Sequence, residues 1–189
     1  MNPLVQKMAP SVTKLIRMDH AKVLAVFHKY QADAAPGTKQ ALANTICLSL
    51  EIHAQLEEEI FYPAMRAADP AMVEKSVPEH DEMRRLISEL RALAPTQDAF
   101  DDTLMMLMRT VIHHVADEET MLLPEAERLL ADRLGELGAQ MTQRKIQLAA
   151  PHAGDMAMDA ARAMPASTLL MSAGALLAGS YLLKQVMKR

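Results

Sequence analysis

Histidine and glutamate recur in this chain at a spacing that suits metal binding. In each of two copies a histidine precedes a glutamate by four residues, as in His53 with Glu57 and His114 with Glu118, and a proline by ten. Residues four apart on a helix lie on one face, one turn apart, so each pair can bind the same ion. Imidazole nitrogens and carboxylate oxygens, without sulfur, favour Fe, Mn or Zn.

A shorter motif repeats with the longer one. An acidic residue followed by a histidine occurs as Asp19-His20 and Glu79-His80, so that 33 residues separate His20 from His53 and 34 separate His80 from His114. The whole unit therefore repeats at 60 to 61 residues. Such a duplication predicts a dinuclear metal centre in a four-helix bundle. The predicted ligands are His20, His53, Glu57, His80, His114 and Glu118.

The alternative interpretation, that these residues are ordinary core residues without a metal, is weaker. A single histidine on an apolar stripe is usually a core residue, but a buried, unpaired carboxylate costs several kcal/mol. Six such residues in two matched sets are expensive unless metal ions satisfy them. Two roles stay open for the other acidic residues, a solvated flank or acceptors for imidazole N–H groups. Of Glu58, Glu59, Asp117 and Glu119, we expect Glu58 and Glu119 to matter more, because they occur in both copies.

Three further histidines are not predicted ligands. His113 could reach Glu118 at a spacing of five, but alignment of the repeats selects His114. His28 and His152 have no partner in the repeat, so we expect surface or packing roles. The sequence assigns no catalytic residue.

The elements that must position the ligands are helical. Half of the chain is hydrophobic and only 3% is aromatic, with 16 Met, and strong helix formers dominate. Ser11 and Thr38 are predicted helix N-caps, and breaks are expected at Pro36-Gly37, near Asp69-Pro70 and at Pro95. Arms of about 15 to 19 residues separate each ligand histidine from its turn, roughly 22–28 Å, so antiparallel hairpins bring all four histidines to one level.

The predicted fold is therefore all-α, an antiparallel up-and-down four-helix bundle with extra C-terminal helices. Pro63 and Pro124 interrupt helical sequence, and each should kink its helix or start a new segment. Met83, Met105, Met108 and Met121, with Ile, Leu and Val, are expected to form an apolar lining around the site.

Charge and cysteine content narrow the function classes. A net charge of −4 with no basic cluster argues against a nucleic-acid partner. The single cysteine, Cys47, excludes a disulfide framework and a thiolate metal site, fits a reducing compartment and is expected to be buried. The N-terminal residues have no long apolar run, so no signal peptide is expected and the bundle is predicted to be cytoplasmic.

We expect three parts along the chain. Residues 11–149 form the bundle with a helical extension interrupted near Gly135 and Gly138, residues 150–163 a linker, and residues 164–189 an apolar helix. Met164 to Leu183 is twenty residues without a charge, long enough to span a bilayer. Its serines and threonine dilute the hydrophobicity, so a membrane anchor and a helix that docks on the bundle, on a partner or on a second copy both stay open.

Residues 11 to about 130 resemble the hemerythrin-like (HHE cation-binding) family. The resemblance implies two iron ions between four antiparallel helices, bridged by carboxylates and an oxo or hydroxo group, with the four histidines as terminal ligands and Glu57 and Glu118 as bridges. The oxygen carriers of this family have a fifth histidine where this chain has Arg84, which cannot ligate. The motifs that carry the resemblance are Asp19-His20, His53-Ala-Gln-Leu-Glu57-Glu58 with Ile60-Phe61-Tyr62-Pro63, Glu79-His80, and His114-Val-Ala-Asp-Glu118-Glu119 with Leu122-Leu123-Pro124.

Three functions follow as hypotheses. The first is a non-haem di-iron protein that binds O₂, NO or peroxide as a sensor, store or scavenger, since both ions would keep open positions. The second is a di-iron enzyme or iron donor, active in peroxide or NO reduction or in iron-centre repair, because the set of four histidines and two glutamates looks more like the iron-sensing and repair branches of the family. The third is a metal-stabilised scaffold. Iron is favoured by the resemblance, and the spacing is also compatible with Mn or Zn.

Overall fold

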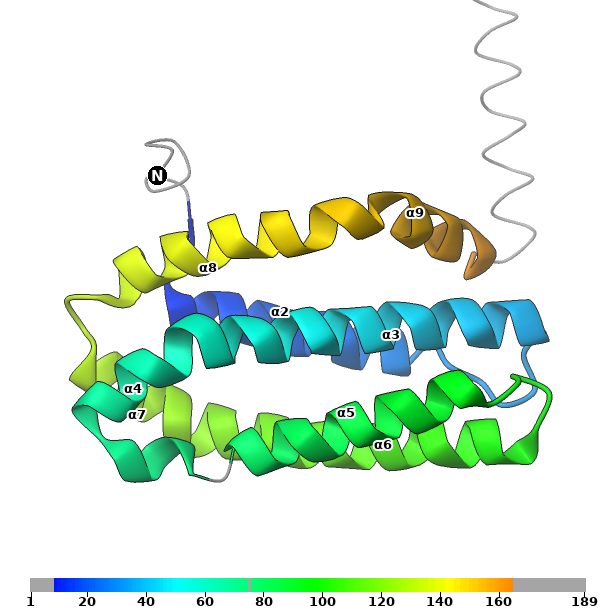
Figure 1. Ribbon diagram of the computed structural model, residues 1–189, viewed down its shortest axis with the longest axis horizontal. Helices are drawn as coiled ribbons and strands as arrows, with labels where there is room; N and C mark the ends of the chain where they lie inside the picture. Colours follow the sequence, from blue (N-terminus) through cyan, green and yellow to red (C-terminus); the bar gives the residue numbers. More distant parts are fainter. Residues whose placement is uncertain (1–8, 75, 165–189) are drawn as a thin grey trace, which may run out of the picture.

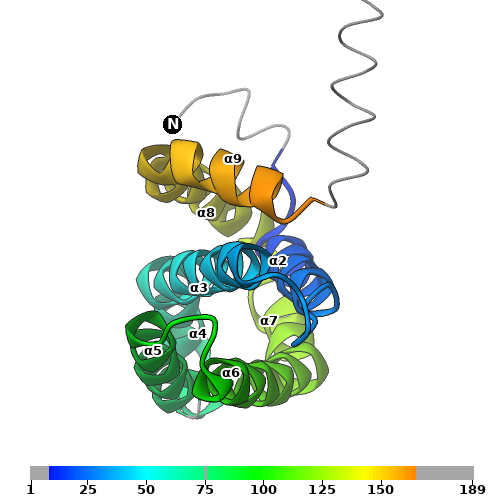
Figure 2. The same ribbon diagram turned by 90° about the vertical axis from the view of Figure 1, so that its right-hand side faces the viewer.

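The bundle predicted from the sequence is confirmed. A computed structural model describes residues 9–74 and 76–164, and within these residues all regular structure is helical. Four long antiparallel helices surround a common centre, as the end-on view in Figure 2 shows. They are α2 (Val12–Phe27), α3 (Pro36–Leu56), α5 (Ser76–Ala92) and α6 (Asp98–Asp117).

Local sequence explains where α2 and α3 begin. The Ser11 side chain accepts a hydrogen bond from the Lys14 backbone N–H at 3.4 Å, as an N-cap does. The prediction of Thr38 as the cap of α3 is wrong, because that helix already begins at Pro36, whose fixed φ suits the first helical position. The Thr38 hydroxyl instead donates to the carbonyl of Arg162 at 3.3 Å.

A wide π-helical turn follows each of the two helices, α3 and α6, that carry the second histidine of each repeat. The turn η1 (Glu57–Phe61) leads from α3 to α4 (Tyr62–Ala68), and η3 (Glu118–Leu122) leads from α6 to α7 (Leu123–Leu129). The N–H of the residue after each turn bonds five residues back, to the carbonyl of Glu57 or Glu118. Each proline then lies in the first turn of a new helical segment, as predicted. Such turns widen the helix and redirect the side chains that follow.

Two apolar clusters fill the bundle, one on each side of a polar layer. Along α2, His20 lies between Ile16 of the first cluster and Val23 of the second. Along α3, His53 lies beside Leu50 of the second cluster. The polar layer is therefore enclosed between two regions that exclude water.

The predicted methionine lining is only partly right. Met83 is buried and Met108 is half-buried against the second cluster, but Met105 is 40% exposed and Met121 is 59% exposed. Met105 lies one residue off the inward stripe of α6. Met121 lies in η3, where the extra residue of the wide turn gives the buried position to Leu122.

The C-terminal part of the described chain covers one face of the bundle. After a short 3-10 helix, η2 (Pro70–Val73), between α4 and α5, the remaining elements are α8 (Leu134–Ala149), η4 (Ala150–His152) and α9 (Ala153–Arg162). Figures 1 and 2 show α8 and α9 lying outside the bundle, against α2 and α3. The segment predicted as a linker is thus helical. Its alanine-rich composition suggested a spacer, but alanine is the strongest helix former and α9 packs on α3.

The position of the interruption in the helical extension also differs from the prediction. The chain turns between Leu129 and Leu134, and both Gly135 and Gly138 lie inside α8. A Cβ atom on Gly138 would lie 2.0 Å from the carbonyl oxygen of Pro10. A glycine at this position therefore lets α8 approach the backbone that precedes α2.

Two other predictions concern membrane association and the cysteine. The apolar helix of residues 164–189 lies, apart from Met164, outside the described residues. Among the helices that are described, none has the length and apolarity needed to cross a bilayer. Cys47 is buried as expected, and burial raises the pKa of its thiol to about 12, which keeps it protonated and unreactive.

Candidate metal centre

The six residues predicted as ligands are all buried and meet in one layer. Each is no more than 3% exposed, and each histidine comes from a different long helix. The ring centroids of His20 and His53 are 4.9 Å apart and those of His80 and His114 are 4.8 Å apart. Across the bundle, the rings of His53 and His114 are 5.9 Å apart. The prediction that the antiparallel hairpins bring the histidines to one level is confirmed.

The two glutamates lie among the inner imidazole nitrogens. Glu57 Oε2 lies 3.2 Å from His53 Nε2 and 3.3 Å from His80 Nε2. Glu118 Oε2 lies 3.3 Å from His20 Nε2 and 3.6 Å from His114 Nε2. The six residues form two overlapping groups whose ligand atoms lie within 4.8 Å of one another. These groups are His20, His53, His114 and Glu118, and His53, Glu57, His80 and His114.

Carboxylates hold the outer nitrogens of three of the four imidazoles. The Nδ1 atoms of His20 and His80 face Glu119 at 3.0 Å and Glu58 at 2.9 Å, so of the two roles left open by the sequence both glutamates take that of acceptor. A carboxylate accepts, so it places the hydrogen on Nδ1 and leaves the lone pair of Nε2 pointing into the centre. Arg84, which stands in place of a fifth histidine, donates to Glu58 at 2.6 Å and so supports this arrangement.

Glu79 plays the same part for His114, with a distance of 3.0 Å between the carboxylate and Nδ1. The sequence analysis used Glu79 only as part of a repeated dipeptide and gave it no role. The signal was present, because an acidic residue precedes the first histidine of both copies.

The residues present fit a pair of cations. The Nε2 atoms of His80 and His114 face each other at 3.4 Å, and with both Nδ1 hydrogens directed outward these atoms offer only lone pairs. Several buried polar atoms have no hydrogen-bond partner of acceptable geometry among the described residues. They are His20 Nε2, both ring nitrogens of His53, Glu57 Oε1 and Glu118 Oε2. Buried acceptors that converge without donors are costly, and a cation between them removes that cost.

Tyr62 is the principal residue of the centre that the sequence analysis missed. Its hydroxyl donates to Glu118 Oε1 at 2.9 Å and lies 3.2 Å from Glu57 Oε2. Its ring stacks on His80, with centroids 5.5 Å apart. Burial, reinforced by the two carboxylates, raises the pKa of Tyr62 well above its usual value, so the hydroxyl stays a hydrogen-bond donor. The second copy of the repeat has Leu123 at this position, so the two halves of the centre differ.

The electrostatics of the metal-free centre are those of two carboxylates that cannot both be charged at low cost. Burial, and then repulsion by Glu118, raise the pKa of Glu57 well above its ordinary value. Burial also opposes ionisation of Glu118, but His20 and His114 outweigh it and lower the pKa of Glu118. Burial lowers the pKa of His53, which stays neutral and able to ligate.

A second asymmetry involves His53. In the repeat, His53 corresponds to His114 and Asp19 corresponds to Glu79, so Asp19 would be the acceptor for His53 Nδ1. Asp19 instead pairs with Lys145 of α8, and His53 Nδ1 has no partner within the described residues. Asp19 and His53 both line a cavity of about 10 Å³, roughly the space of one water molecule.

The remaining candidates lie where the sequence analysis placed them. The side chain of His113 is 70% exposed, against 1% for His114, so the choice of His114 from the repeat agrees with the geometry. His28 and His152 are exposed. Glu59 pairs on the surface with Arg144 at 2.7 Å.

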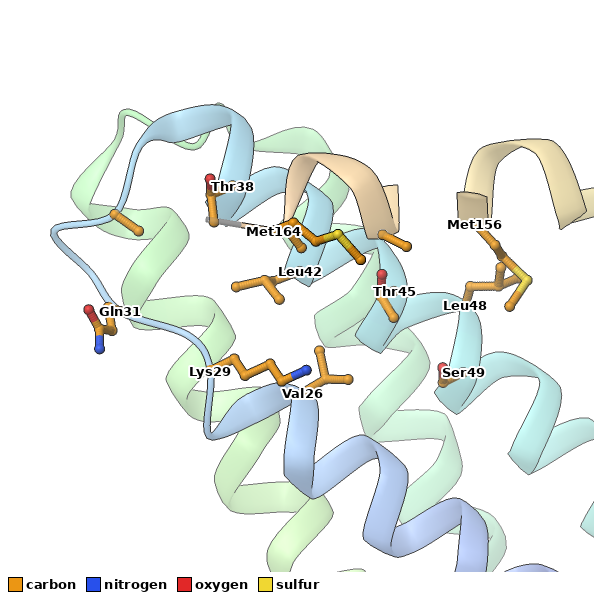
Figure 3. Close-up of a pocket in the computed structure, with 13 residues that line it drawn as sticks. Val26, Lys29, Gln31, Thr38, Leu42, Thr45, Leu48, Ser49, Met156 and Met164 are labelled. Atoms are coloured by element: carbon orange, nitrogen blue, oxygen red, sulfur yellow. The ribbon is translucent and has the colours of Figure 1, made fainter. Parts of the chain in front are cut away.

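A large cavity in the described part of the chain lies away from the histidine layer. It has a volume of about 730 Å³ and lies between the bundle and α9, lined by Leu42, Leu48, Met156 and Met164 with Lys29 at one side (Figure 3). Cavities that border the histidine layer have volumes of only about 10 and 100 Å³.

Buried imidazoles and carboxylates at the middle of an antiparallel four-helix bundle define a cation-binding bundle protein of the hemerythrin type. The model of the family described as "Hemerythrin HHE cation binding domain" matches residues 11–126 of this chain. The chain therefore belongs to this family. The family predicted from the motifs is confirmed.

The chain is also similar to a protein of known structure and to a protein of related sequence. The crystal structure of a hemerythrin HHE cation-binding domain-containing protein from Mycobacterium kansasii superposes with a TM-score of 0.67 at 20% identity, covering 78% of this chain and 92% of that one, and it shares the fold. A protein of Nostoc sp. named DNA nickase is 33% identical over 113 residues, 59% of this chain and 32% of that protein. The chain thus spans about a third of that relative, whose nicking activity belongs to the relative.

Proposed function

We propose that this chain is a non-haem di-iron protein that binds O₂, or a related small molecule such as NO or peroxide, as a sensor, store or scavenger. The observation that carries the proposal is the convergence of four inward Nε2 atoms and two buried carboxylates, each of which has one oxygen without a hydrogen-bond partner of acceptable geometry among the described residues. His20 and His53 would hold one ion and His80 and His114 the other, with Glu57 and Glu118 between them. When bound, two irons would supply redox chemistry and open coordination positions.

The surroundings of the centre favour a small diatomic ligand over a larger one. Apolar clusters lie on both sides, and only small cavities reach the ligands. The hydroxyl of Tyr62 lies beside both carboxylates, and its single hydrogen, which is donated to Glu118, can turn instead to a small polar molecule held there. Exclusion of water limits the access of protons to such a ligand.

A second candidate is a di-iron enzyme or an iron donor. Arg84 favours it, because the guanidinium pairs with Glu58 at the rim and supplies no ligand to the ions. Ions held by fewer imidazoles are released and react more readily. Turnover of peroxide or NO, or transfer of iron to an acceptor that lacks it, separates this candidate from reversible binding.

The first prediction tests the cofactor and the ligand together. Protein isolated without added metal should contain two irons per chain by elemental analysis. The anaerobic ferrous protein should change its visible absorption on exposure to O₂ or NO and recover when the gas is removed. The same protein loaded with Zn(II) is the control and should stay silent. A ferrous spectrum indifferent to both gases would contradict small-molecule binding, and a stable zinc-only protein would favour the scaffold.

The second prediction follows from the unequal halves. Replacing Lys145 with alanine frees Asp19 to accept from His53 Nδ1, and hydrogen bonds to the outer nitrogen of a histidine ligand strengthen its bond to the metal. We expect one of the two metal affinities to rise about tenfold in chelator competition. The neighbouring Arg144→Ala change, which removes only a surface pair with Glu59, should leave both affinities unchanged. Equal affinities in Lys145→Ala and wild type would show that Asp19 does not act on His53.

A further inference from the structure

A second cluster of metal-binding groups lies on the surface beside the buried centre. Glu79, His113 and Asp117 each offer a ligand atom within 4.8 Å of the others. His113 Nδ1 lies 3.2 Å from Glu79 Oε1 and 4.0 Å from Asp117 Oδ2. The side chains are 70% exposed for His113 and 39% exposed for Asp117. One imidazole and two carboxylates form a ligand set suited to a hydrated divalent ion such as Fe(II).

Glu79 connects this cluster to the centre. One oxygen, Oε1, faces His113 at the surface, and the other, Oε2, accepts from Nδ1 of the buried His114 at 3.0 Å. The same carboxylate thus belongs to the surface cluster and orients a predicted ligand of the centre.

A cavity extends between the two places. Its volume is about 100 Å³, enough for several water molecules. It borders Glu79 and Asp117 on the outside and the buried Glu118 on the inside. Glu118 is 1% exposed, and its Oε2 has no hydrogen-bond partner of acceptable geometry in the described residues. The other residues that line the cavity are Ala71, Met72, Ser76, Met121 and Leu122.

We propose that Glu79, His113 and Asp117 form an uptake site, at which a divalent metal ion first binds before it passes through this cavity to Glu118. The inference rests on the proposed function, because it requires that the buried centre holds metal. The transfer is a ligand exchange: the ion keeps its charge, gives up water and its ligands Glu79, His113 and Asp117, and gains Glu118 and the inner imidazoles. The negative charge of Glu79 and Asp117 raises the local concentration of cations at the mouth.

Because the cluster is exposed, its side chains can be replaced to test the uptake site without disturbing the packing of the bundle. In the double variant His113→Ala/Asp117→Asn, both changed side chains lie at the surface, so the fold is retained. Metal-free protein is mixed with an excess of Co(II) or Fe(II) under anaerobic conditions, and metal loading is followed by stopped-flow absorption. We expect loading about tenfold slower than in wild type, with the same final stoichiometry and the same equilibrium affinity. The wild-type rate should fall with added salt, and the rate of the variant should depend on salt much less.

A matched control changes an exposed histidine and aspartate elsewhere. The variant His152→Ala/Asp155→Asn alters an exposed pair near α9, remote from the cavity, and should load at the wild-type rate. Equal loading rates in wild type and the His113/Asp117 variant would overturn the uptake site, as would a lower final stoichiometry in that variant. Failure of the wild-type protein to bind either metal would instead contradict the proposed function.

Discussion

Replacing Glu57 with glutamine should stabilise the metal-free protein and abolish binding of the two metal ions. Without metal, the fold must keep a proton on the fully buried Glu57, because burial and the neighbouring Glu118 raise its pKa. A neutral amide removes that cost, so we expect a gain of about 1–3 kcal/mol at pH 7, or roughly 2–10 °C in the unfolding temperature. The same amide is a poor bridging ligand, so the stabilising effect of added metal should be lost.

The pH dependence of this effect has a definite sign. A carboxyl group whose pKa is raised in the folded state holds more protons folded than unfolded, so its contribution to stability falls as the pH rises. The loss begins above about pH 4.3, where an unfolded glutamate ionises, and ends at the raised pKa of Glu57. The difference in free energy of unfolding between Glu57→Gln and wild type should therefore grow across this window.

Denaturant unfolding of the metal-free proteins at several pH values measures this difference. Glu58→Gln is the matched control, since Glu58 is adjacent, partly exposed and paired with Arg84, and its replacement should give no gain. A metal-free Glu57→Gln protein less stable than wild type would show that the carboxylate is there for the fold. Changes in stability alone, with metal binding intact, would support the scaffold hypothesis.

His114 and its neighbour His113 give the second large effect. His114 belongs to both groups of ligand atoms, so His114→Ala should weaken the binding of both ions. Loss of an outer hydrogen-bond partner already costs 10–100-fold in metal affinity, so removal of a ligand should cost at least about 100-fold. His113→Ala should keep two ions at equilibrium, because this imidazole lies outside the buried layer.

Elemental analysis and chelator competition on the two variants check this prediction, and circular dichroism confirms that both remain helical. Two tightly bound ions in His114→Ala would exclude His114 as a ligand. Loss of metal at equilibrium in His113→Ala, but not in His114→Ala, would show that the tightly bound metal lies at the surface cluster and not in the buried layer.

The ligand positions could be predicted from the sequence because they are marked by the spacing of residues along the chain. A spacing of four residues places His53 and Glu57 on one helix face wherever the helix lies, and the repeat of 60 to 61 residues selects His114 over His113. Similar arm lengths on either side of each turn then place the four histidines at one level. The family, the all-α bundle and the restart of helices at Pro63 and Pro124 follow from patterns of the same local kind.

Other features depended on packing between segments far apart in the chain. Tyr62 enters the centre because the wide turn before it redirects its side chain, and the same kind of turn moves Met121 to the surface. Asp19 pairs with Lys145 of α8, 126 residues away, and does not accept from His53 as Glu79 does from His114. Residues 150–162 form helix where composition suggested a linker, because α3 offers α9 a surface on which to pack. The sequence by itself determined which side chains could ligate metal, since helical spacing is a local property. Only the tertiary structure decided which groups surround those ligands, since that depends on where each helix meets its neighbours.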